Sequence, residues 1–134
     1  MGRQGATRLG YGHKRWSLLM DRGDVVLVAL DPAVGSEQGK MKPAVIVSNN
    51  GANDSATRRG RGVVTVVPVT TNVRSIYPFQ VLLTARDSGL AMDSKAQAEQ
   101  VRSIATERIV RTLGHIGGER LRELDDALRL HLSL

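Results

Sequence analysis

The chain has 134 residues, contains no cysteine and carries a formal net charge of +6. This length fits one domain with its own core, and the lack of cysteine excludes disulfides and thiolate metal sites. No apolar run approaches the roughly 20 residues that span a bilayer, and the N-terminus lacks the apolar stretch of a secretory signal, so we expect a cytoplasmic protein without a membrane partner.

The positive charge is concentrated at the N-terminus. Residues 1–16 contain four cations and no acid, so only +2 remains in the rest of the chain. Such charge attracts polyanions, including nucleic acid, without sequence specificity. Residues 1–19 also lack a sustained helix or strand period. We interpret residues 1–19 as a poorly ordered basic leader and residues 20–134 as the folded domain.

Four strands are predicted in the first part of the domain, because runs of β-branched and apolar residues are bounded there by turn residues. They are Asp24–Leu30, Pro43–Ser48, Val63–Val69 and Phe79–Thr84. Pro68 predicts a bulge or an end near the close of the third strand. A long polar loop over 31–42 and a connector over 49–62 are expected between them, and the connector carries a basic patch of Arg58, Arg59 and Arg61.

The second part of the domain predicts less regular strands and one helix. Lys95–Ile104 alternates small apolar and polar residues and then breaks phase at Glu99–Gln100, which suggests a bulge beside a site. Thr106–Val110 is expected to form one helical turn with Thr106 as a candidate N-cap. Glu119–Leu132 carries a leucine stripe at helical spacing, which predicts a C-terminal helix. Five or six short strands and one packed helix indicate a compact, β-barrel-like α+β domain.

Several familiar motifs fail on inspection. The glycine-rich stretch Gly35–Met41 has the wrong spacing and no final Ser or Thr for a phosphate-binding P-loop. The three histidines, His13, His115 and His131, show no ligand-like spacing, which disfavours a histidine metal site or a two-histidine nuclease site. We also interpret the tripeptide Arg22-Gly23-Asp24 as a chance occurrence. No metal or other cofactor is expected.

The remaining candidates for phosphate chemistry are hydroxyls, amides, acids and cations in segments that border the predicted strands. They are Ser36, Glu37, Gln38, Lys42, Thr70, Thr71, Glu99, Gln100 and Arg102. Many of them belong to short motifs that follow one another in order: Arg22-Gly23-Asp24, Asp31-Pro32, Gly35-Ser36-Glu37-Gln38, Lys42-Pro43-Ala44-Val45-Ile46-Val47-Ser48, Pro68-Val69-Thr70 and Glu99-Gln100-Val101-Arg102. Each motif is weak alone. Together, from about Arg22 to the C-terminus, they resemble the MazF/PemK toxins.

This resemblance implies a fold, an activity and partners. The fold would be a small SH3-like β-barrel that forms a homodimer. The activity would be metal-independent cleavage of single-stranded RNA at short sequences by the RNA 2′-hydroxyl, leaving a cyclic phosphate and a 5′-hydroxyl. A cognate antitoxin would neutralise the toxin by occupying the RNA groove. Such chemistry needs positioning, proton transfer and charge stabilisation at the phosphate.

The resemblance also implies roles for single residues. Thr70 matches the family's active-site threonine, although it is also typical of a strand-end residue that binds its own backbone. Ser36, Glu37 and Gln38 match a loop that approaches RNA, and a solvated loop is the alternative. Gln100 matches a residue lining the groove, with Thr71 and Arg102 as further RNA-binding candidates. Glu99 is expected either at the groove or as a structural partner of Arg102.

Lys42 stands where the family usually has an arginine immediately before the proline of the second strand. Lysine is a point charge and lacks the planar fork of arginine. It could stabilise the transition state, donate a proton or simply be solvated. Two rival functions stay open.

One is a non-enzymatic toxin that poisons DNA topoisomerase through its C-terminal helix, as related barrels can, because a fold does not fix a function. The other is a weakened homologue that titrates antitoxin, and this rival follows from the lysine at position 42.

Overall fold

The computed structural model describes residues 20–30 and 41–134. The predicted leader, residues 1–19, therefore lies outside the described residues, as does most of the predicted loop, including Ser36, Glu37 and Gln38. The end of that loop is corrected, because the second strand begins at Met41 and so includes Lys42.

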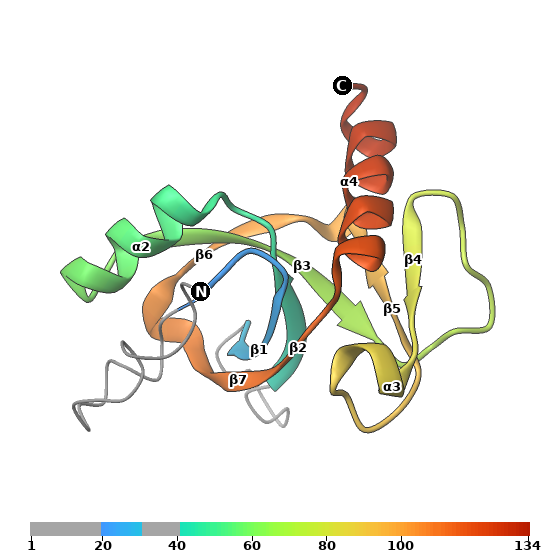
Figure 1. Ribbon diagram of the computed structural model, residues 1–134, viewed down its shortest axis with the longest axis horizontal. Coiled ribbons are helices and arrows are strands. Elements are labelled where there is room, and N and C mark those ends of the chain that lie inside the picture. The colour runs from blue at the N-terminus through green and yellow to red at the C-terminus, as the bar shows by residue number, and fades with distance from the viewer. Residues whose placement is uncertain (1–19, 31–40) are drawn as a thin grey trace, which may run out of the picture.

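In the described residues, seven strands form one antiparallel sheet (Figure 1). Its order is β4-β5-β3-β2-β1-β7, and β6 also pairs with β3. The strands are β1 (Asp24–Ala29), β2 (Met41–Ile46), β3 (Val63–Thr70), β4 (Gln80–Leu83), β5 (Ser94–Gln97), β6 (Arg102–Ala105) and β7 (Ile109–His115). The helices are α2 (Asn50–Arg59), α3 (Ala85–Ser88) and α4 (Gly118–Leu132), with 3₁₀ turns η2 (Ala98–Gln100) and η3 (Thr106–Arg108).

Five of these strands, β6-β3-β2-β1-β7, curve into a loose barrel. The barrel stays open between β6 and β7, which η3 connects. Arg108 of η3 bridges toward β1, because its Nη1 donates to the carbonyl oxygens of Ala29 and Leu30 at 2.9 and 3.0 Å. The predicted α+β class with an SH3-like barrel and a C-terminal helix is thus confirmed, with seven strands in place of the expected five or six.

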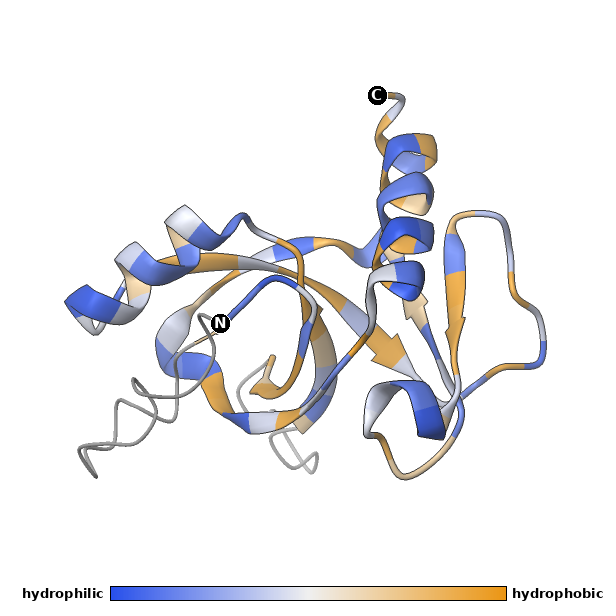
Figure 2. Ribbon diagram, in the orientation of Figure 1, coloured by the Kyte–Doolittle hydropathy of each residue, from blue (hydrophilic) through white to orange (hydrophobic). Residues whose placement is uncertain are grey.

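Much of the sheet is hydrophobic (Figure 2). Successive residues of a strand point to opposite sides, and apolar side chains are buried on both faces of the sheet. One set fills the barrel and is called the barrel core: Val26, Val28, Ala44, Ile46, Val64, Val66, Ile104 and Ile109, with Met20, Leu30 and Ala56. The other set packs with α4 and is called the helix core: Val25, Val45, Val47, Val67, Val69, Val81, Leu83, Ala96, Ala98, Ile116, Leu124 and Ala127. Strands β1, β2 and β3 contribute to both cores.

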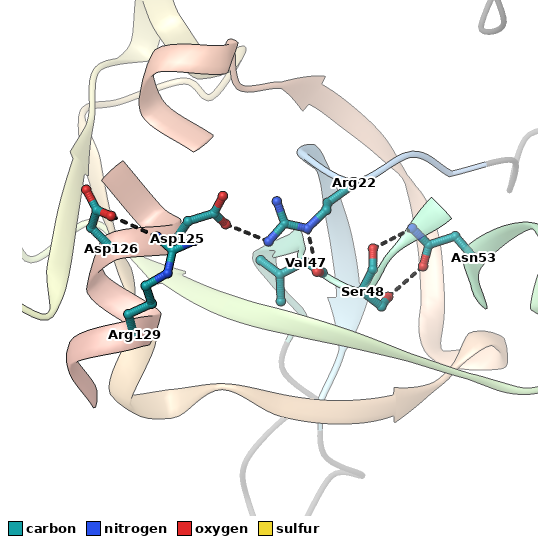
Figure 3. Close-up of polar contacts among 7 residues, drawn as sticks. All are labelled: Arg22, Val47, Ser48, Asn53, Asp125, Asp126 and Arg129. Atoms are coloured by element: carbon teal, nitrogen blue, oxygen red, sulfur yellow. Dashed lines mark hydrogen bonds and ion pairs between the residues drawn. The ribbon is translucent and has the colours of Figure 1, made fainter. Parts of the chain in front are cut away.

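Arg22 fastens α4 to the barrel (Figure 3). Its Nη2 lies 2.6 Å from Oδ1 of Asp125 on α4, and its Nε donates to the carbonyl of Val47 at 2.8 Å. Gly23 follows with a φ of +99°, a conformation that favours glycine. Asp24 then lies buried with Oδ1 2.8 Å from Nδ1 of His115. The tripeptide that looked accidental in the sequence is therefore a structural joint between β1, β7 and α4.

The connector predicted over 49–62 is wrong, because it contains the ten-residue helix α2. Asn49 caps this helix, and its side chain accepts a hydrogen bond from the amide of Ala52. Gly60 ends the helix in the left-handed conformation. Asn53 is buried, where its Nδ2 donates to the carbonyl of Ser48 at 2.9 Å. Asn49 is therefore a helix cap, and Asn53 anchors the helix to Ser48, the residue before the cap.

Two further predictions are corrected near β6. The expected helical turn over Thr106–Val110 is only the three-residue η3, and β7 begins at Ile109. Thr106 is no N-cap, because that position belongs to Ala105, and within the described residues the buried Thr106 hydroxyl has no hydrogen-bond partner. Pro68 lies inside β3, at the point where the partner of this strand changes from β6 to β5.

Candidate active site

Lys42 and Thr70 lie at the same end of the β2–β3 pair. The antiparallel register pairs Ala44 with Pro68, and Lys42 and Thr70 each lie two residues further toward that end. Residues that are paired or separated by two along a strand point to the same face of a sheet. The two predicted catalytic residues therefore share one face and one edge, although they are 28 positions apart in the sequence.

The Thr70 hydroxyl is oriented by the backbone that follows it. Its Oγ1 accepts a hydrogen bond from the amide of Asn72 at 3.2 Å. This is the local backbone contact expected of a strand-end threonine. It occupies an acceptor position of the hydroxyl, however, and a hydroxyl has one donor as well. The O–H of Thr70 thus stays available to donate to a phosphate oxygen.

A second lysine lies on the same face of the sheet as Lys42 and Thr70. Lys95 of β5 pairs directly with Thr70 of β3 and is only 7% exposed. Its Nζ donates to the carbonyl of Ser75 at 2.7 Å and lies 5.7 Å from the centre of the Tyr77 ring. Sequence reasoning missed Lys95, because a lysine among small alternating residues is typical of a solvated strand face.

The segment 71–79 joins Thr70 to β4 and runs along the outer edge of the molecule (Figure 1). Residues 71–78, which include Thr71, are all exposed. The far end of the segment is held by Gln80, whose Oε1 accepts from the amide of Tyr77 at 3.1 Å. Nε2 of Gln80 in turn donates to Glu99 at 2.8 Å. Polar side chains from β4, β5 and η2 therefore fix a segment that is itself exposed to solvent.

The predicted irregularity at Glu99–Gln100 is present as η2. On β3, Val66 pairs with Arg102 and Val69 pairs with Ala96. Three steps along β3 therefore correspond to six steps from Ala96 to Arg102, and η2 contains the extra residues. Gln100 and Arg102 are both exposed. Arg102 stands beside Val66, about 13 Å along β3 from Thr70. Gln100 and Arg102 thus lie beside the middle of β3 and not at the end where Lys42 and Thr70 lie.

Glu99 does not brace Arg102, which corrects one of the two expectations for this acid. One oxygen of Glu99 accepts from Gln80, and within the described residues the other is buried without a hydrogen-bond partner. Ser36, Glu37 and Gln38 fall outside the described residues, so their relation to Thr70 is not defined.

Neither a metal cluster nor a membrane helix is found in the parts of the chain that the structure describes. Residues 20–30 and 41–134 contain no group of three His, Cys, Asp or Glu side chains that could hold a metal ion. No helix in these ranges is long and apolar enough to cross a bilayer. The chemical groups at the Thr70 edge are instead a hydroxyl and two ammonium groups.

Comparisons with known proteins agree with this architecture over nearly the whole described chain. The model of PemK-like, MazF-like toxins of type II toxin–antitoxin systems matches residues 21–132. Endoribonuclease MazF9 of Mycobacterium tuberculosis is 59% identical over 116 residues, which cover 87% of this chain and 98% of that protein. Endoribonuclease EndoA of Bacillus subtilis is 30% identical over 118 residues, covering 87% and 97%.

Solved structures show the same fold. The MazE–MazF crystal structure (Form-II) from Deinococcus radiodurans has a TM-score of 0.70 at 27% identity and covers 87% of this chain and 97% of that one. A mycobacterial endoribonuclease in complex with its cognate antitoxin has a TM-score of 0.68 at 25% identity, covering 86% and 96%. The chain therefore belongs to the PemK-like, MazF-like toxins of type II toxin–antitoxin systems, a family whose curated relatives named here are endoribonucleases.

Proposed function

We propose that this protein is a toxin that cleaves single-stranded RNA at short sequences without a metal ion. The observation that carries the proposal is the placement of Lys42 and Thr70 on one face at one end of the β2–β3 pair. A hydroxyl with a free donor and an ammonium group at one edge are suited to a phosphate diester. The RNA substrate would make the cytoplasm its place of action.

The reaction would use the RNA's own 2′-hydroxyl as nucleophile. This hydroxyl loses its proton, its oxygen bonds to phosphorus, and the bond from phosphorus to the 5′-oxygen breaks. The leaving 5′-oxygen then takes up a proton, so the products are a 2′,3′-cyclic phosphate and a 5′-hydroxyl. Thr70 would donate a hydrogen bond to a phosphate oxygen, while Lys42 stabilises the growing negative charge or supplies the proton.

Other predicted residues would hold the RNA strand on either side of this edge. Thr71 directly follows Thr70, whereas the exposed Gln100 and Arg102 lie further along β3. A guanidinium such as that of Arg102 binds phosphate through two parallel hydrogen bonds. Ser36, Glu37 and Gln38, which precede β2 in the sequence, complete the proposed RNA-binding set.

Two protein partners belong to the proposal. The mycobacterial endoribonuclease solved in complex with its cognate antitoxin supports a cognate antitoxin as the first partner. This antitoxin would occupy the RNA site. We also propose a homodimer, because an isologous pair is the commonest assembly of a small oligomeric protein. Light scattering at micromolar concentration is expected to give twice the 14.5 kDa chain mass.

The test is to incubate purified protein and a long single-stranded RNA in excess chelator. Discrete fragments with 5′-hydroxyl ends, which polynucleotide kinase labels without prior phosphatase treatment, are expected. Thr70→Ala should lower the single-turnover rate about a hundredfold or more, since a preorganised donor is lost. Thr112→Ala, at an exposed threonine of β7, is the matched control and should cut at the wild-type rate. Intact RNA with the wild-type protein would overturn the proposal and leave a non-enzymatic toxin.

A further inference from the structure

Lys95 is an unusual residue for the position it occupies. Its neighbour Ala96 points into the helix core, so Lys95 points to the opposite face of β5, away from α4. A lysine on the outer face of a strand normally extends into water, yet only 7% of Lys95 is exposed. The partners of its ammonium group, the carbonyl of Ser75 and the ring of Tyr77, both belong to segment 71–79.

The ammonium group of Lys95 has few partners for a buried charge. It donates to one backbone carbonyl at 2.7 Å and faces one aromatic ring at 5.7 Å. No carboxylate of the described residues lies within ion-pair distance of it. Burying an ammonium group is costly unless its hydrogen bonds are satisfied. An apolar side chain would fill this space without that cost, so the charge is best understood through what it binds.

What Lys95 binds is the segment that leaves Thr70. The carbonyl of Ser75 lies in the middle of this segment, and the Tyr77 ring is stacked on Phe79 near its end, with ring centres 5.6 Å apart. Tyr77 itself is 52% exposed, so its position depends on these contacts and on the Gln80 bond to its amide. The start of the segment also orients Thr70, through the amide of Asn72.

We propose that Lys95 is a positioning residue for RNA cleavage: it tethers segment 71–79 beside Thr70 without touching the RNA. The segment then forms a fixed wall at the edge where Thr70 and Lys42 lie. Misplacing a catalytic hydroxyl by about 1 Å can cost about a hundredfold in rate. The effect of Lys95 on RNA cleavage rests on the proposed function, whereas its tethering of segment 71–79 does not.

Trypsin tests the tether directly, because Arg74 lies exposed in the middle of the segment. Lys95→Met keeps the length of the side chain and removes the charge. It should speed tryptic cleavage after Arg74 about tenfold, as expected when a hydrogen bond of about 1.4 kcal/mol to a charged donor is lost. Arg111→Met removes one exposed cation from β7 and should leave this rate unchanged. Equal protection of Arg74 in Lys95→Met and wild type would overturn the tether.

The kinetic arm uses a short RNA oligonucleotide that spans a mapped cut site. Lys95→Met should lower kcat about tenfold or more. Affinity is measured on the same oligonucleotide with a 2′-deoxy nucleotide at the cut position, and its salt dependence should keep the wild-type slope. Two results would overturn the positioning role. The first is an unchanged kcat in a Lys95→Met protein whose segment 71–79 is cut faster by trypsin. The second is a slope of log affinity against log salt concentration that is reduced by about 0.7, as expected when one phosphate contact is lost.

A second variant covers the case in which Lys95→Met does not fold. Tyr77→Leu changes an exposed side chain and removes both the cation–π contact with Lys95 and the stacking on Phe79. It should speed cleavage after Arg74 about threefold more than Phe79→Leu, which removes the stacking alone. No acceleration in a folded Tyr77→Leu protein would count against the tether. A wild-type protein that cuts no RNA would instead overturn the proposed function, while the trypsin result would still decide whether Lys95 holds the segment.

Discussion

Lys42 allows charge stabilisation and proton transfer to be separated by substitution. Lys42→Ala removes both and is expected to slow cleavage strongly. Lys42→Arg keeps the charge and adds a planar guanidinium, which can make two hydrogen bonds to a phosphate. This variant should preserve or raise the cleavage rate if Lys42 only stabilises charge. A guanidinium does not deprotonate in proteins, so the same variant should fail if Lys42 supplies a proton.

Single-turnover cleavage of one RNA at several pH values measures this difference. Arg122→Ala, at an exposed position of α4, controls for the loss of one positive charge. Equal rates for wild type, Lys42→Arg and Lys42→Ala would remove Lys42 from the mechanism.

Asp24 shows how one buried side chain can secure two strands. Its Oδ2 accepts from the amide of Asp21 at 2.9 Å, and its Oδ1 lies 2.8 Å from Nδ1 of His115. The carboxylate is fully buried, and Asp24→Ala removes the hydrogen-bond partner of both the Asp21 amide and the His115 ring. We expect it to lower the free energy of unfolding by about 2–4 kcal/mol, as read from the urea midpoint.

The matched control is Asp126→Ala, which removes an exposed carboxylate that binds Arg129 at 3.0 Å. Such surface ion pairs contribute about 0–1 kcal/mol, so its midpoint should stay near wild type. Similar shifts of the urea midpoint in the two variants would show that burial of Asp24 adds nothing to its contribution to stability.

Among the leucines of α4, Leu124 is the one that is completely buried. Leu124 is completely buried in the helix core, whereas Leu130 on the same helix is 56% exposed. Alanine has a higher helix propensity than leucine, so the helix itself is not weakened. Leu124→Ala should cost about 2–5 kcal/mol of unfolding free energy, and Leu130→Ala should stay within about 0.5 kcal/mol in the same urea titration. A larger loss at Leu130 would mean that α4 packs through its outer side.

The elements also show what sequence periodicity can and cannot predict. β1 and β3 were predictable because both faces of these strands are buried, and continuous apolar runs follow from that. β7 was not, since only Ile109 at its start is fully buried and its other residues show no clear alternation. The helix α2 was missed because the pairs Asn50-Gly51 and Asn53-Asp54 favour turns. In the structure both pairs lie within the helix, and the Asn53 side chain is buried and bonds to Ser48.

The candidate site was predictable only in part, for a related reason. Lys42 and Thr70 were found through motifs, and the β2–β3 register then brings them to one edge. Lys95 belongs to no motif, and its contacts with Ser75 and Tyr77 join residues about 20 positions apart, which no local pattern encodes. A polar residue whose partners are a backbone carbonyl and an aromatic face leaves no complementary charge in the sequence to search for.

At the scale of the whole molecule, the basic leader can be tested as a separate part. The core already includes Met20, which is 2% exposed. Deleting residues 1–19 should therefore leave the unfolding midpoint unchanged. RNA affinity should depend less steeply on salt, because four of the six net positive charges are removed. Thermal melting and a salt titration of RNA binding check these two outcomes, and a truncated chain that fails to fold would refute the division into leader and domain.

The pairing of the first strand with the last sets an order of events during synthesis. β1 lies between β2 and β7, and Asp24 and His115, which join β1 to β7, are 91 positions apart. On the ribosome, the edge of β1 that pairs with β7 stays unpaired, and the barrel core lacks Ile109, until β7 has been made. Helix α4, which packs on the other face of the sheet, emerges later still. The nascent chain is thus an incomplete fold until both β7 and α4 have emerged.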